Sequence, residues 1–273
     1  MDTVVQARPA KWLKWWAVFN LHLQDSFAYR AQGIVWILTD TVPTITLPLM
    51  WLAAFGSRQM INGFTRQELV AYYLCMSVCS NIAVAHPWEI AKDIKDGRLS
   101  IYLTRPFSYY WFIFASNLSW RLVRSVLFVP FFFLTLAVLR PYLSWGNFHL
   151  GIEFWLSLIL AHILSYQLSW CLGQAAFFLV EISGIYEFYY MIGAFLAGQM
   201  APLQMLPEGI RAVAHFLPFS YVLWFPVQIF LGRIDSAQAY QGMAYQLVWI
   251  VVLAILGKWL WNSGLKRYTA VGI

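Results

Sequence analysis

Long apolar stretches constrain this chain more than any other feature of its sequence. Residues 107–139 form one such stretch, interrupted by charge only at Arg121 and Arg124. Over the whole chain 61% of residues are hydrophobic and 11% are charged, against roughly a quarter charged in soluble domains. A soluble domain could not hide so much apolar surface. The composition therefore excludes a soluble globule, a disordered chain and a secreted disulfide scaffold, and it indicates a polytopic membrane protein.

The length of these stretches sets the number of membrane crossings. A helix needs ~20 residues to cross a hydrocarbon core of ~30 Å. We expect an all-α polytopic membrane protein, residues 1–273 forming one transmembrane domain with six transmembrane helices. The predicted spans are 31–55, 69–88, 122–139, 152–179, 185–203 and 242–261. The run at 107–139 is longer than a bilayer is thick, so we expect its first third to lie outside the hydrocarbon.

Two further segments are apolar but are not predicted to span the membrane. Residues 10–29 are too polar to cross, but six large apolar side chains fall on one helical face, which predicts an amphipathic helix lying in the membrane interface. These side chains are Trp12, Trp15, Trp16, Phe19, Leu23 and Phe27. Residues 204–241 are apolar but contain proline every eight to eleven residues, which breaks a straight span. We expect a re-entrant hairpin of short helices there, at the outer membrane edge.

Lysine and arginine indicate the orientation. With both termini in the cytoplasm, thirteen of these residues fall in inside segments and five in outside segments, which is the positive-inside bias. The formal net charge of +6 reflects this bias. No basic run outside the short loops indicates a nucleic-acid partner.

Residues 89–106 are the one long charged stretch and lie on the predicted cytoplasmic side. Glu89, Lys92, Asp93 and Asp96 recur at helical spacing, and Gly97 suits the end of a helix. A polar helix held between two spans would form a docking surface for a cytosolic partner; a merely solvated loop is the alternative. The candidate docking residues are Glu89, Lys92, Asp93, Lys95, Asp96, Gly97 and Arg98.

Two motifs resemble those of a known family. The run IKDGRLSIYLTRP (94–106) resembles the I-x-x-G-x-L-x-x-x-L-x-x-P loop between spans 2 and 3 of ABC-2 type permeases, the membrane subunits of ABC exporters. The run GQMAPLQMLPEGIRAVAHFLPFSYV (198–222) is similar to the segment after their span 5. The span count, the interfacial helix and the outer hairpin match as well. The resemblance covers nearly the whole chain, and is greatest to a subgroup of about 270 residues often found as paired permeases.

The resemblance implies an ATP-driven exporter in a bacterial cytoplasmic membrane. Two permease subunits, identical or paralogous, would pair among the membrane lipids. Each would dock a cytosolic ABC ATPase subunit through a coupling helix at 89–104. The sequence has no G-x-x-x-x-G-K-[ST] loop, because Gly257-Lys258 is followed by tryptophan and has no glycine five residues before it. We therefore expect no enzyme activity and no cofactor in this chain, with ATP and Mg²⁺ on the partner subunit.

Asp40 is the most unusual single residue, because a carboxylate at mid-span costs roughly 2.5–3.5 kcal/mol on insertion scales. It could attract a cationic substrate, aided by aromatic rings. The rings considered are Trp36, Tyr72, Tyr73, Tyr189 and Tyr190. The alternative is a structural aspartate bonded to a neighbouring threonine or paired with another helix. The expected substrate is amphiphilic or hydrophobic, a drug-like cation being slightly favoured over a lipid or a lipid-linked sugar.

Other intramembrane features have structural interpretations. The predicted span 5 carries small residues that permit close helix contact, either between permease subunits or within one; these are Gly193, Ala194, Ala197 and Gly198. Arg121 and Arg124 are expected near the inner head groups or paired with Glu181 or Glu187. Cys75, Cys79 and Cys171 are expected to be buried free thiols.

Two other functions remain open from the sequence. One is an ion-coupled secondary transporter that uses Asp40 as its proton site. The other is a membrane-embedded lipid-modifying enzyme, which would need clustered His, Asp or Arg residues at one membrane face. Loss of charge within 89–106 would uncouple an ABC permease but would leave an ion-coupled carrier intact.

Overall fold

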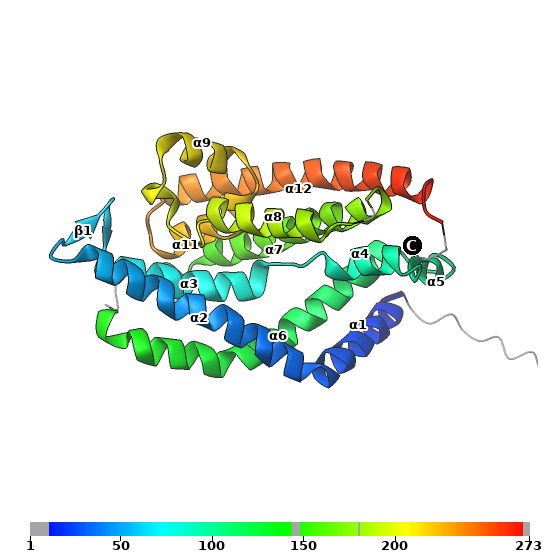
Figure 1. Ribbon diagram of the computed structural model, residues 1–273, viewed down its shortest axis with the longest axis horizontal. Helices are drawn as coiled ribbons and strands as arrows, with labels where there is room; N and C mark the ends of the chain where they lie inside the picture. The colour runs from blue at the N-terminus through cyan, green and yellow to red at the C-terminus, as the bar shows by residue number, and fades with distance from the viewer. Residues whose placement is uncertain (1–10, 144–147, 180, 270–273) are drawn as a thin grey trace, which may run out of the picture.

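The computed structural model describes residues 11–143, 148–179 and 181–269. Within them the chain is an elongated bundle of helices (Figure 1). The α-helices are α1 (Lys11–Ala28), α2 (Arg30–Phe55), α3 (Arg66–Ala83), α4 (Trp88–Lys95), α5 (Leu99–Leu103), α6 (Tyr109–Leu139), α7 (Ile152–Gly173), α8 (Ser183–Leu196), α9 (Glu208–Phe216), α10 (Phe219–Val222), α11 (Trp224–Phe230) and α12 (Ser236–Leu265). Short 3₁₀ turns occur at η1 (Arg140–Tyr142), η2 (Gln174–Phe177) and η3 (Leu203–Met205), and strands at β1 (Met60–Ile61) and β2 (Phe64–Thr65).

The bundle has two distinct ends (Figure 1). The long helices α2, α3, α6, α7 and α12 run along its length, with α4, α5 and the C-terminal residues at one end and β1, α9 and α11 at the other. We call these the α4–α5 end and the hairpin end. Contacts tie both terminal segments to the α4–α5 end, because Tyr268 donates a hydrogen bond to the Gly97 carbonyl at 2.9 Å and Lys14 donates one to the Pro106 carbonyl.

Among the described residues, five helical stretches are long and apolar enough to cross a membrane. They are Arg30–Phe55, Arg66–Lys95, Tyr109–Tyr142, Ile152–Phe177 and Ser236–Leu265. The second of these runs from α3 through non-helical residues into α4. These stretches confirm a helical polytopic membrane protein and correspond to five of the six predicted spans.

The sixth predicted span, 185–203, corresponds to α8. This helix has 14 residues, so at 1.5 Å per residue it is about 21 Å long, shorter than a hydrocarbon core. The chain then turns at Gly198, whose φ is 77°, and continues through η3 into α9. The sixth crossing thus stays a prediction for α8 together with the segment that follows it.

α6 is continuous over 31 residues. At 1.5 Å per residue it extends about 46 Å, which exceeds a ~30 Å hydrocarbon core. The position of its first third outside the hydrocarbon stays a prediction. α1 packs against this part of α6. Ser119 donates a hydrogen bond to the Phe19 carbonyl at 3.2 Å. The helix predicted at 10–29 is therefore present, and its position in the membrane interface stays a prediction.

α7 lies at the centre of the packing, against α3, α11 and α12. Its side chains Phe154, Leu158 and Leu164 are buried in the main apolar core. A polar contact crosses this core, where Gln246 of α12 donates hydrogen bonds to the Tyr221 and Ser157 carbonyls at 2.9 and 3.1 Å. The cysteines are free, and Cys75 and Cys79 are buried in the same core.

The hairpin end is built from tight turns. Asn62 and Gly63 both have positive φ, 47° and 79°, as a two-residue type I′ turn requires. Arg233 donates a hydrogen bond to the Gly63 carbonyl at 2.7 Å and pairs with Glu68 at 3.1 Å. These contacts join the strands to the connection between α11 and α12. The predicted outer hairpin at 204–241 consists of η3 and α9 to α11, and it ends earlier than predicted because α12 starts at Ser236.

Candidate functional site

α4 has a buried underside and a charged outer side. Ile90 and Ile94 are buried in an apolar cluster shared with α6 and α7. Asp93 also points inward, where its carboxylate accepts a hydrogen bond from Tyr109 at 2.8 Å and pairs with Arg98 at 2.7 Å. α4 is thus held rigidly against the bundle, and Asp93 serves this anchoring and does not face outward.

Four of the remaining predicted docking residues form the exposed outer side of this segment, whereas Lys95 and Gly97 are half-buried. Gly97 follows α4 with a φ of 70°, and α5 begins at Leu99. Tyr268 bonds both the Gly97 carbonyl and Ser100, so the C-terminal segment supports the turn from behind. The exposed charged side chains of the surface are Glu89, Lys92, Asp96 and Arg98. We call these four residues the α4–α5 surface.

Apolar side chains beside these charges were missed in the sequence. Trp88, Ile101 and Leu103 are exposed, with Ile101 showing 54% of its surface. Apart from Gly97, the predicted docking residues are all charged, although helical spacing places Leu99 inward and so turns Ile101 outward. The α4–α5 surface with these three side chains has the mixed apolar and charged character of a protein interface.

A break in helical structure connects α4 to α3. Residues 84–87 are not helical, and their backbone groups are bonded by side chains of α7. The Ala85 N–H donates to Ser165 Oγ and Ser169 Oγ donates to the Ala85 carbonyl, both at 2.9 Å. His162 of α7 reaches the Ala83 carbonyl at the end of α3, at 3.3 Å. Non-helical backbone at membrane depth persists only where protein groups satisfy it in this way.

Aromatic side chains of α8 hold the same break from another side. Tyr190 Oη lies 3.0 Å from His86 Nδ1. Tyr186 packs edge-on against Trp88, with ring centroids 4.4 Å apart. The connection between α3 and α4 is therefore in contact with both α7 and α8. A displacement of α4 would be transmitted directly to these helices.

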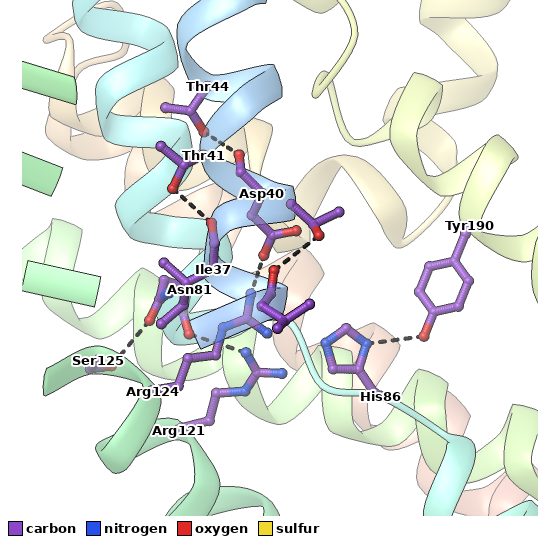
Figure 2. Close-up of polar contacts among 12 residues, drawn as sticks. Ile37, Asp40, Thr41, Thr44, Asn81, His86, Arg121, Arg124, Ser125 and Tyr190 are labelled. Atoms are coloured by element: carbon purple, nitrogen blue, oxygen red, sulfur yellow. Dashed lines mark hydrogen bonds and ion pairs between the residues drawn. The ribbon is translucent and has the colours of Figure 1, made fainter. Parts of the chain in front are cut away.

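Asp40 forms an ion pair inside the bundle (Figure 2). Its carboxylate accepts a hydrogen bond from Arg124 of α6. Arg121, one turn earlier, donates to the Asn81 carbonyl near the end of α3 at 3.2 Å. The predicted pairing of Arg124 with Glu181 or Glu187 is wrong, because α6 packs against α2 and so brings Arg124 to Asp40. The alternative in which Asp40 pairs with a neighbouring helix is the arrangement observed.

A cavity of about 150 Å³ opens beside Asp40. Its polar lining side chains come from α2, α3 and the segment after α8; they are Asp40, Thr44, Tyr73, Ser77, Ser80, Asn81 and Gln199. A polar cavity in apolar helices, beside an ion pair whose arginine is buried, is a candidate binding site. It lies between helices corresponding to predicted spans 1 and 2.

The structure gathers only part of the aromatic set predicted to surround Asp40. Tyr73 lines the cavity. Trp36 is half exposed on the outer face of α2, and Tyr72 is fully buried and bonded to the Gly198 carbonyl at 2.6 Å. Tyr189 and Tyr190 pack edge-on against each other, with Tyr190 against His86. Tyr73 is thus the member of the set that the structure places with Asp40.

The small residues of predicted span 5 do not share one helix face. Gly193 and Ala194 lie in α8, whereas Ala197 and Gly198 follow its end. Ala197 belongs to the main apolar core. A Cβ atom at Gly198 would lie 2.5 Å from Tyr72 Oη. Ala197 and Gly198 therefore pack within the subunit, which is the second of the two sequence interpretations.

The fold defines a helical polytopic membrane protein with a polar cavity between its helices. Residues 41–272 match the family model described as ABC-2 family transporter protein, which covers most of the chain. The chain belongs to this family and is a permease-type transmembrane subunit. No curated protein and no solved structure matches the chain.

Proposed function

We propose that this chain is the permease subunit of an ATP-driven exporter. It moves an amphiphilic or hydrophobic substrate outward across a bacterial cytoplasmic membrane, paired with a second permease subunit of identical or paralogous sequence. A separate cytosolic ABC ATPase subunit binds ATP and Mg²⁺. The α4–α5 end faces the cytoplasm, so that both termini lie on the ATPase side.

The proposal rests on the exposed charges and the rigid anchoring of the α4–α5 surface. Exposed charges of both signs stand on a short helix whose underside is fixed by Asp93, Tyr109 and buried isoleucines. A rigid surface of this kind can transmit a displacement of a bound partner without changing its own shape. The partner's surface would need complementary charges and a groove for Trp88, Ile101 or Leu103, which are exposed.

The non-helical residues between α3 and α4 provide a route by which movement of α4 would reach the rest of the bundle. When ATP closes the ATPase pair, α4 would move as a body with the partner. The four residues between α3 and α4 would transmit this movement to α3, while His86 and Trp88 would transmit it to α8 through Tyr190 and Tyr186. α3 and the segment after α8 line the cavity beside Asp40. Movement at the α4–α5 surface would thus reshape the cavity.

The proposal is tested by purifying the tagged chain in a mild detergent and identifying the subunits that accompany it. We expect a cytosolic ABC ATPase to be recovered with the native chain and to be reduced at least several-fold with Lys92→Glu. Arg140→Glu makes the same charge change at an exposed residue of the hairpin end and should leave recovery unchanged. Purification without any ATP-hydrolysing subunit, under conditions that preserve other membrane complexes, would overturn the proposal.

A further inference from the structure

Positive charge exceeds negative charge at the polar cluster beside the cavity. Arg121 and Arg124 are buried, 4% and 6% exposed, and the carboxylate in contact with the pair is that of Asp40. One carboxylate opposite two guanidinium groups leaves a local charge of +1. An isolated buried charge is costly unless it is paired, so this cluster favours a second anion.

Several donors of the two arginines are also without an acceptor. Within the described residues Arg121 Nε, Arg121 Nη2 and Arg124 Nε are buried and have no hydrogen-bond partner. Among the described residues, Arg121 bonds through Nη1 alone, to the Asn81 carbonyl. Buried donors are almost always paired in native proteins. Three such donors on two adjacent guanidinium groups point to an acceptor-rich ligand.

The two arginines do not themselves line the cavity, and they reach it through the residues that accept their hydrogen bonds. Asp40 and Asn81 line it, and the same two residues accept the hydrogen bonds of Arg124 and Arg121. The Asp40 side chain is 56% exposed, so it can turn toward the open space and release Arg124. At about 150 Å³ the cavity is below the roughly 300 Å³ of a site for a whole drug-sized ligand. It fits a head group, not an entire amphiphile.

We propose that this cavity binds the phosphate head group of an amphiphilic substrate, held by Arg124 and Arg121 after the phosphate displaces the Asp40 carboxylate. The inference rests on the proposed function, since it names the substrate class of the exporter. Guanidinium groups match phosphate oxygens in paired hydrogen bonds. The hydroxyl groups of Ser77 and Ser80 line the cavity and can donate to the remaining oxygens.

The opposite assignment, a cationic head group at Asp40, fits the cluster less well. The Asp40 carboxylate is already paired with Arg124, and Arg121 adds a second positive charge beside it. A cation would therefore have to compete with Arg124 and approach Arg121 against repulsion. The two assignments give opposite results for Asp40→Asn, since this variant removes a competitor of a phosphate but removes the ligand of a cation.

The test measures binding of two amphiphiles with the same tail, dodecyl phosphate and dodecyltrimethylammonium, to the purified full chain in phosphatidylcholine nanodiscs. We expect dodecyl phosphate to bind the native chain at least tenfold more tightly than dodecyltrimethylammonium. Asp40→Asn should tighten dodecyl phosphate binding several-fold, and Arg121→Gln should weaken it at least tenfold. Arg140→Gln and Asp25→Asn, at exposed positions, should change neither affinity.

Further measurements distinguish a loss of binding from a loss of fold, identify the source of the phosphate group, and keep this test independent of the proposed function. Thermal unfolding of each variant, together with the milder Arg121→Lys, shows whether a lost affinity reflects a lost fold. If inorganic phosphate displaces dodecyl phosphate, the phosphate group alone is sufficient for binding. If it does not, the site requires an amphiphile that carries the phosphate. Both results support an anion site. Tighter dodecyltrimethylammonium binding that Asp40→Asn abolishes, or dodecyl phosphate binding that Arg121 variants leave unchanged, would overturn the inference. No ATPase takes part, so this result stands apart from the recovery of an ATPase partner.

Discussion

Gly198 shows how one residue without a side chain positions two elements. Its φ of 77° ends α8, and its carbonyl accepts the hydrogen bond of the fully buried Tyr72. A Cβ atom would lie 2.5 Å from Tyr72 Oη and 3.2 Å from the Trp224 ring. No small movement of Tyr72 relieves this contact, because its ring is packed in the core.

Gly198→Ala should therefore destabilise the fold by roughly 2 kcal/mol or more, combining left-handed backbone strain with overpacking. The measurement is thermal unfolding in detergent, followed by the loss of helical circular dichroism. Gly184→Ala is the matched control, since that glycine is exposed in the first turn of α8 and a Cβ atom there meets nothing within 4 Å. Equal melting temperatures for Gly198→Ala and the native chain would contradict the packing described.

Glu181 gives a pH dependence at the start of α8. The backbone N–H of Ser183 is the main cause that lowers the pKa of this carboxylate to about 2, followed by the Ser183 hydroxyl and the Ile182 N–H. A pKa that is lower in the folded state gives stability that is present above the unfolded value and lost as pH falls through the folded value. The native chain should therefore melt above Glu181→Gln at pH 7. The difference between the two melting temperatures should shrink as the pH falls from 4.5 to about 2. A difference that does not change with pH would contradict this role of Glu181.

At the same scale, sequence reasoning found Asp40 but not its partner. A carboxylate in an apolar run is visible in the sequence, because its insertion cost is local. The pairing with Arg124 spans 84 positions and depends on how α2 crosses α6. Spacing along one helix does not contain that information, so Arg124 was assigned to the wrong carboxylates.

At the scale of elements, the break between α3 and α4 is the feature on which coupling depends. The sequence predicts one span from 69 to 88, whereas α3 ends at Ala83. Pro87 was a signal, since the residue before a proline avoids helical angles. The exact position of the break is set by Ser165 and Ser169 of α7, which bond the backbone of Ala85. Groups about 80 residues distant cannot be recognised from local pattern.

Ser165→Ala should cost about 1–3 kcal/mol, because it leaves the buried Ala85 N–H without an acceptor. Unfolding of the purified chain in detergent measures this cost. Ser57→Ala, at an exposed turn position, serves as the control and should be neutral. If both variants unfolded alike, the α7 serine would have no part in supporting the break.

Other elements differ in how much of them could be predicted. Residues 94–106 were recognised by motif, but the single coupling helix predicted at 89–104 is two helices. α4 ends at Lys95, Gly97 follows with a positive φ, and α5 begins at Leu99. The turn at Asn62-Gly63 carries a strong local hairpin signal, yet the all-α prediction does not include strands β1 and β2. α8 is shorter than predicted because its apolar composition continues beyond Gly198, where backbone geometry, not hydropathy, ends the helix.

At the scale of the whole molecule, the two ends of the bundle predict a membrane orientation (Figure 1). The α4–α5 end should face the cytoplasm and the hairpin end should face outward. In intact cells, a membrane-impermeant maleimide should label an Asn62→Cys variant, and should label Asp96→Cys only after the membrane is opened. Native thiols interfere little, because Cys75 and Cys79 are buried and Cys171 is partly buried. Labelling of Asp96→Cys in intact cells would contradict this orientation and would place the α4–α5 end outside the cell.

Photo-crosslinking from the α4–α5 surface in living cells tests whether a cytosolic ATPase binds this permease there. A photoreactive phenylalanine analogue replaces Lys92 in one variant and Tyr240 in another. Tyr240 is exposed at the start of α12, at the hairpin end. We expect position 92, and not position 240, to crosslink to a cytosolic ATP-hydrolysing subunit. A crosslink from neither position, or from position 240 alone, would contradict the account of this chain as a permease driven through α4 and α5.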